Sequence, residues 1–150
     1  MFTQTKYILI AGALLIIVAI LSLGYTLRPT TVTINDQVFI TEIAATPAAQ
    51  QQGLSDRDHL LVNHGMLFTY TDPQIREFWM LRMHFPLDII WIRDGRIVDI
   101  SHNLPMPETG QEPARAKSQT PADAVLEINA GLSSRYGFKV GDRVTVRSNH

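Results

Sequence analysis

The sequence has no cysteine, which excludes disulfide bonds, thiol nucleophiles and thiolate metal sites. It also lacks an excess of either charge, because 13 Lys and Arg residues stand against 14 Asp and Glu residues. A nucleic-acid-binding protein needs a strongly basic face, so no nucleic-acid partner is predicted. Neither a Gly-rich phosphate loop nor a His-Glu-x-x-His motif is present, and no cofactor is predicted.

The N-terminal region lacks charge almost completely. Residues 7–27 carry none and consist mostly of Ile, Leu, Ala and Val. At about 1.5 Å of rise per residue, a helix of this length crosses a hydrocarbon core roughly 30 Å thick. We therefore predict a short cytoplasmic N-terminus at residues 1–6, a single-pass transmembrane helix at residues 7–27 and a linker at residues 28–30.

A cleaved signal peptide is the alternative for this segment. Residues 22–24 would make a poor cleavage site, and the apolar run exceeds the roughly 7–15 residues of a signal peptide, which favours a retained anchor. Lys6 precedes the run, and Arg28 is the only Lys or Arg after it before Arg57. The positive-inside rule then predicts a cytoplasmic (inner) membrane protein with an extracytoplasmic, periplasmic C-terminal domain.

Residues 31–147 are predicted to form one mainly β domain, a β-rich α+β fold, followed by a tail at residues 148–150. Alternating and β-branched runs predict strands at residues 31–34, 38–43, 66–70, 77–80, 87–92, 96–100, 124–128 and 143–147. Residues 103–123 are polar and Pro-rich, which predicts a long exposed loop. About seven strands with two short helices favour a small barrel or sandwich.

Local signals define the turns and helices of this domain. Asn35-Asp36 and Asp94-Gly95 lie between apolar runs and predict hairpins, the second of them with a two-residue turn. Thr46-Pro47 predicts a helix that begins with a Thr cap and ends at Gly53. Asn129 is expected to cap a second short helix at residues 130–136.

Several short motifs follow one another in a distinctive order. They are Gln52-Gly53-Leu54, Gly65-Met66-Leu67-Phe68, Phe78-Trp79-Met80, residues 85–92, residues 94–98, Val125-Leu126-Glu127 with Gly131, and Gly137 with residues 140–144. Over about residues 31–146 the chain resembles a prokaryotic family of domains of unknown function, DUF192. The resemblance implies a β-rich domain, often behind a signal or membrane anchor, and supplies no activity. Many members have Lys where this chain has Leu81, and some carry cysteines in the Pro-rich loop.

Asp88 is the leading candidate for chemistry, since it lies within the most apolar strand. A buried carboxylate is costly unless it is paired or hydrogen-bonded. It could serve as a general acid or base with a raised pKa. It could instead have a structural role, which we favour, by accepting backbone N–H bonds or pairing with Arg82. An enzyme would use Asp88 with a histidine, His84 being the nearest candidate.

Methionines and histidines form a second candidate set, because thioether and imidazole groups are ligands for copper. The candidate metal ligands are Met83, His84, His102 and Met106. Their spacing is loose, and methionine more often fills gaps in a core, so no metal is assigned.

Aromatic side chains supply the third candidate. Phe78, Trp79 and Met80, together with Asp88, are the candidate lining of a ligand pocket, although aromatics in alternating strands also build cores. The leading prediction is a non-catalytic, envelope-associated module that binds a small ligand or an envelope protein. A small hydrolase-like enzyme and a copper-binding protein are the alternatives.

Overall fold

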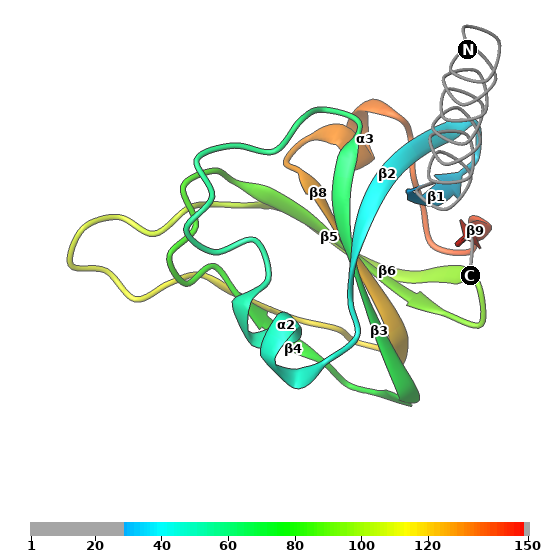
Figure 1. Ribbon diagram of the computed structural model, residues 1–150, viewed down its shortest axis with the longest axis horizontal. Helices are drawn as coiled ribbons and strands as arrows, with labels where there is room; N and C mark the ends of the chain where they lie inside the picture. Colours follow the sequence, from blue (N-terminus) through cyan, green and yellow to red (C-terminus); the bar gives the residue numbers. More distant parts are fainter. Residues whose placement is uncertain (1–28, 149–150) are drawn as a thin grey trace, which may run out of the picture. The chain divides into compact units, whose positions relative to one another are not determined.

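A seven-stranded mixed sheet forms the centre of the computed structural model, which describes residues 29–148 (Figure 1). Its strand order is β6-β5-β8-β3-β2-β1-β9. The strands are β1 (Thr30–Ile34), β2 (Gln37–Ala44), β3 (His64–Gln74), β5 (Leu87–Arg93), β6 (Arg96–Leu104), β8 (Ala122–Asn129) and β9 (Val144–Arg147). Neighbours are antiparallel, except that β2 and β3 run parallel.

Smaller elements cover this sheet. Strands β4 (Glu77–Trp79) and β7 (Arg115–Lys117) pair with each other, and the two helices of the described residues are α2 (Pro47–Gln52) and α3 (Leu132–Arg135). In Figure 1, α2 and β4 lie together and well apart from α3. The predicted membrane helix at residues 7–27 lies outside the described residues. Between residues 29 and 148, no helix is long and apolar enough to cross a membrane.

The sheet curls so that its two edges approach each other. The N–H of Val144 donates to the carbonyl of Gly95 at 2.9 Å, and the N–H of Gly141 donates to the carbonyl of Ile97 at 2.8 Å. These bonds join the β5–β6 hairpin to the segment that begins β9. The prediction of a mainly β domain with two short helices is confirmed, and the architecture is a curled half-barrel.

Both faces of the sheet are buried, and β5 shows this most clearly. Leu87, Ile89 and Trp91 belong to one hydrophobic cluster, which also includes Leu54, just beyond α2. Ile90 and Ile92 belong to a second cluster, which includes Leu132 of α3. All six residues from 87 to 92 are buried, as the almost wholly apolar run predicted.

The predicted turns and the first helix are confirmed. The β1–β2 hairpin pairs Ile34 with Gln37, and the β5–β6 hairpin turns at Asp94 and Gly95 with φ of 50° and 68°. The Thr46 hydroxyl accepts the N–H of Ala49 at 3.2 Å, and Pro47 opens α2 as expected. Turn and cap chemistry resides in adjacent residues, so the sequence alone defines it.

Three predicted boundaries need correction. Residues 103–123 are not one loop, because they contain the end of β6, all of β7 and the start of β8. Strand β3 continues to Gln74, past the expected stop, through an irregularity in its pairing with β8 after Thr69. The second helix begins at Leu132 rather than residue 130, and Asn129 ends β8, where its amide donates to the carbonyl of Leu60 at 3.0 Å.

Candidate functional site

Three hollows meet at Trp79, which is 45% exposed at the end of β4. Two of them have volumes of about 220 and 240 Å³. The first lies between Glu77, Phe78 and Arg115, and the second adjoins α2, Leu81 and Arg82. Pairing of Trp79 with Arg115 across β4 and β7 places the guanidinium 5.2 Å from the indole ring centroid, which orients the indole.

The third hollow, called the inner cavity, leads from Trp79 towards the sheet. Its volume is about 30 Å³, room for only one or two water-sized groups. It is lined by residues 50–55, Phe68, Phe78, Trp79, Met83 and Glu127. Phe78 meets Phe68 edge to face, with ring centroids 4.8 Å apart. The inner cavity therefore combines aromatic rings and one carboxyl group with residues 50–55, three of which are glutamines.

Glu127 is the exceptional residue of this cavity. The strand register aligns Glu42, Met66, Glu127 and Ile89 on neighbouring strands β2, β3, β8 and β5, so these side chains share one face of the sheet. Glu127 is only 6% exposed, and its Oε2 atom is buried without a hydrogen-bond partner among the described residues. Buried polar atoms are nearly always hydrogen-bonded, so this oxygen is a departure that calls for explanation.

Arg57 is the positive charge that acts on Glu127, but it is engaged elsewhere. Its guanidinium donates to both carboxylate oxygens of Glu42, at 2.5 and 2.8 Å. This ion pair lowers the pKa of Glu42 and raises the pKa of Arg57. Burial raises the pKa of Glu127 to about 8, because the distant attraction of Arg57 offsets only part of the lost hydration. The Glu127 carboxyl is therefore largely protonated at neutral pH.

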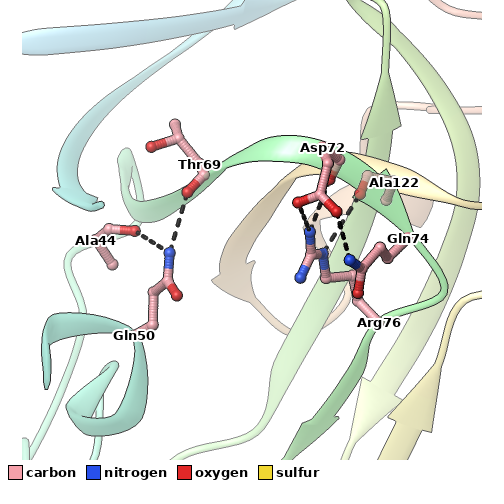
Figure 2. A network of polar contacts seen from close by, with 7 residues as sticks. All are labelled: Ala44, Gln50, Thr69, Asp72, Gln74, Arg76 and Ala122. Carbon is pink, nitrogen blue, oxygen red and sulfur yellow. Dashed lines mark hydrogen bonds and ion pairs between the residues drawn. The ribbon is translucent and has the colours of Figure 1, made fainter. Parts of the chain in front are cut away.

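Helix α2 is fixed against the sheet by one side chain. The amide of Gln50 donates to the carbonyls of Ala44 and Thr69, at 3.3 and 3.0 Å (Figure 2). Figure 2 shows Gln50 reaching from α2 to the end of β2 and to β3. In the same view, Arg76 donates to the carbonyls of Asp72 and Ala122, which holds the chain just before β4. Both elements that carry the rim of the inner cavity are thus anchored to the sheet.

The segment after α2 is joined to the segment after β4. Asp56 and Arg82 both have left-handed backbones, with φ of 65° and 55°, and the Arg82 Nε atom donates to both Asp56 oxygens at 3.0 and 2.9 Å. The hydroxyl of Ser55 also donates to the carbonyl of Leu81 at 2.9 Å. The Arg82 guanidinium lowers the pKa of Asp56. Such backbone conformations persist where surrounding contacts define the geometry, and these contacts hold the cavity rim in one shape.

Asp88, the leading sequence candidate, lies on the opposite face of the sheet. One of its oxygens accepts the N–H of Asn103 at 2.8 Å, and the other accepts the N–H of Ser133 at 2.9 Å and its hydroxyl at 2.6 Å. Asp88 is fully buried. Its bonds attach β6 and α3 to β5, which is the arrangement that a structural role requires.

The same contacts bring Asp88, Ser133 and His102 into one chain. His102 Nδ1 lies 2.8 Å from the Ser133 hydroxyl oxygen. Because that hydroxyl donates its single proton to Asp88, His102 must be the donor in this contact. A nucleophilic serine needs a histidine that accepts its proton, and Ser133 is fully buried as well. The hydrogen bonds among Asp88, Ser133 and His102 therefore join β5, α3 and β6, and they do not activate Ser133 as a nucleophile.

The candidate metal ligands lie in unlike surroundings. Met83 is buried and lines the inner cavity, whereas Met106 is 51% exposed. His84 contacts Asp58 at 3.4 Å, and His102 contacts Ser133. Among residues 29–148, no three His, Asp or Glu side chains are grouped to hold a metal ion.

The sequence prediction identified the aromatic part of the cavity and missed its carboxyl group. Phe78 and Trp79 line the inner cavity, whereas Met80 is 1% exposed within the core and Asp88 is not among the lining residues. Glu127 had a signal in the sequence, since it stands between Leu126 and Ile128 in a strand with apolar residues on both faces. Its lack of a partner depends on distant segments that the strand itself does not reveal.

Comparisons with known proteins agree with the motifs. The family model DUF192, described as "Uncharacterized ACR", matches residues 30–146. The chain belongs to this family. No curated protein matches it. A crystal structure of a protein of unknown function from Novosphingobium aromaticivorans DSM 12444 is 39% identical, with a TM-score of 0.69, over 78% of this chain and 83% of that one.

A second crystal structure is also similar, with a lower sequence identity to this chain. It is a Sinorhizobium meliloti 1021 protein whose description proposes a transcription regulator. It is 31% identical, with a TM-score of 0.68, over 78% of this chain and 91% of that one. The half-barrel is therefore the fold of a DUF192 domain, and the family itself supplies no activity.

We predict that Asp88→Asn lowers the free energy of unfolding by about 1–3 kcal/mol, since the amide places an N–H group against a backbone or hydroxyl donor. Chemical denaturation of the full chain measures this change. Asp36→Asn, at an exposed turn position, is the control and should change stability by less than about 0.5 kcal/mol. Equal effects of the two substitutions would contradict the structural role of Asp88.

Glu127 predicts a specific dependence of stability on pH. Its pKa is about 8 in the folded chain against an ordinary value of 4.5, so the folded state binds more protons between these values. Stability from this group is complete below about pH 4.5 and is lost as the pH rises through 8, by up to a few kcal/mol. In Glu127→Gln this contribution should disappear. Thermal unfolding of both proteins from pH 5 to 9 tests this, and parallel curves would refute it.

Proposed function

We propose that this DUF192 domain is a non-catalytic binding module that receives part of a small ligand, or a side chain of a partner protein, beside Trp79. The observation that carries the proposal is the unpartnered Glu127 in a cavity that is also lined by Phe68, Phe78, Trp79 and residues 50–55. Binding sites commonly place few polar groups within an apolar lining, and a perturbed pKa in a hollow marks a candidate site.

The surroundings of Trp79 support this role. An aromatic side chain that is half-exposed between hollows offers contact area on more than one side, and such residues are frequent at recognition sites. The rim is fixed by Gln50 and by the Asp56–Arg82 pair, so little order remains to be gained on binding. A pre-formed site loses less entropy when it is occupied.

The three alternative activities, hydrolysis, DNA binding and copper binding, have less support. A hydrolase-like mechanism with Asp88 lacks a histidine that can accept the Ser133 proton. Direct binding to DNA, which the description of the Sinorhizobium protein would suggest, finds no excess of positive charge in a chain of net charge −1. Copper binding would require Met83, His84, His102 and Met106 to converge, and their separate contacts give no basis for it.

We also propose that residues 7–27 anchor the domain in the cytoplasmic membrane, with the domain on the extracytoplasmic, periplasmic side. The uncharged run and the position of Lys6 support this placement. The binding module then works within reach of the bilayer, because only residues 28–30 separate the apolar run from the domain. Its partner is a small ligand or an envelope protein that meets it there.

Binding at Trp79 can be observed through the two indole N–H signals of the full chain in nuclear magnetic resonance. The Trp91 indole donates to Ser101 at 3.0 Å and is buried, so it serves as an internal reference. A panel of small amines, amides, carboxylates, sugars and alcohols should contain members that shift the Trp79 signal and leave Trp91 unchanged. Trp79→Phe identifies the signal. Shifts confined to other parts of the domain, or none, would refute the proposed site.

The absence of cysteine makes the topology directly testable. Single-cysteine chains with Lys6→Cys or Ser148→Cys are exposed, in intact cells, to a thiol reagent that cannot cross the inner membrane. We expect labelling at position 148 and none at position 6 until the cells are lysed. The reverse pattern would invert the orientation, and a mature chain without its first residues would indicate a cleaved signal peptide.

A further inference from the structure

In the inner cavity, the buried Oε2 atom of Glu127 has no hydrogen-bond partner among the described residues. Arg57 forms its ion pair with Glu42. Glu127 also influences the pKa of Tyr70. The ring of Tyr70 is covered by Arg76, whose guanidinium carbon lies 3.5 Å from the ring centroid. The sheet neighbours of Glu127 are Met66 and Ile89, which offer no polar atom in their side chains except a thioether. A ligand that carries a hydrogen-bond donor can supply this partner.

The cavity restricts the size and charge of that partner. About 30 Å³ admits a compact group of one or two heavy atoms. Besides residues 50–55 and Met83, the lining includes the rings of Phe68, Phe78 and Trp79, and aromatic rings attract cations. An anion would be repelled once Glu127 is ionised, above about pH 8, and a planar guanidinium has more heavy atoms than the space admits. A group that is small, positively charged and rich in N–H donors meets all three conditions.

We propose that the inner cavity receives a primary alkylammonium group, which donates hydrogen bonds to Glu127 while its alkyl stem lies along Phe78 and Trp79. This inference rests on the binding role proposed above and gives the class of ligand for the same site. Both a free alkylamine and a lysine side chain of a partner protein carry this group.

Binding of this ligand is coupled to release of a proton. The charged group that acts on Glu127 is Arg57, from the segment after α2, which is paired with Glu42 of β2. The titratable side chain of Tyr70, from β3, also lies near Glu127. Unoccupied Glu127 is protonated below about pH 8. An alkylammonium, with a pKa of about 10.4, keeps its charge throughout, so its binding favours the carboxylate and displaces the proton. Affinity should therefore rise with pH until Glu127 is ionised.

The test uses the full chain in a neutral detergent and titrates it with n-butylammonium, observed through the Trp79 indole signal and by calorimetry. The matched neutral probe is 1-butanol, which has the same length and no charge. The tripeptide Gly-Lys-Gly is titrated in parallel. Binding of butylammonium alone would indicate a free amine, and tighter binding of the tripeptide would indicate a lysine side chain. Either result supports the ammonium site.

We expect butylammonium to bind at least about tenfold more tightly than 1-butanol at pH 8, and about tenfold more tightly at pH 7 than at pH 6. Glu127→Gln keeps the size of the side chain and should remove both the preference and the pH dependence. Glu112→Gln makes the same change at an exposed position of the loop before β7 and should leave both intact. Because glutamine has nearly the size of the protonated Glu127 side chain and is likewise uncharged, Glu127→Gln is expected to fold.

Equal binding of butylammonium and 1-butanol at Trp79, or unchanged binding by Glu127→Gln, would overturn the ammonium assignment. In that case Trp79 remains a binding site for another class of ligand, and the proposed function stands. If no member of the broader fragment panel shifts the Trp79 signal, the proposed function itself is wrong. The two failures are thus distinguishable.

Discussion

Burial of the sheet on both faces is the constraint on which the rest of the domain depends. One hydrophobic cluster covers the face beside α2 and β4, and the other covers the face beside α3. Residues 87–92 of β5 and 125–128 of β8 are therefore all buried. Any charged residue on these strands needs a partner within the protein, or it must exist in its neutral form.

Two carboxyl groups meet this constraint in opposite ways. Asp88 and Glu127 lie on neighbouring strands, where Asp88 is paired with Ile128 and Glu127 with Ile89. Asp88 accepts three hydrogen bonds that hold β6 and α3 in place. Glu127 has an orphan oxygen and a raised pKa. Burial alone thus does not mark a candidate functional carboxyl group, whereas burial without a partner, beside a cavity, does.

The sequence predicted most of what neighbouring residues determine. The hairpin turns, the Thr46 cap and the doubly buried strand β5 all follow from short patterns. Strand β7 was missed because it has only three residues in a Pro-rich stretch and forms by pairing with the distant β4. Asp88 drew attention because its own strand is apolar. The state of Glu127 depends on α2, β4 and the loop carrying Arg57, so its significance emerges only when these segments are placed together.

An unpartnered buried carboxyl group destabilises the domain in its ionised form, and this cost gives a reason to expect a bound partner. The contacts that fix the rim, from Gln50, Ser55 and the Asp56–Arg82 pair, prevent the cavity from collapsing onto Glu127. Arg57 lies close enough to affect its pKa but remains held by Glu42. Among the described residues, Glu127 therefore has no ion-pair partner of its own. A ligand that donates to it stabilises the folded state in proportion to its affinity, which links occupancy of the site to stability of the domain.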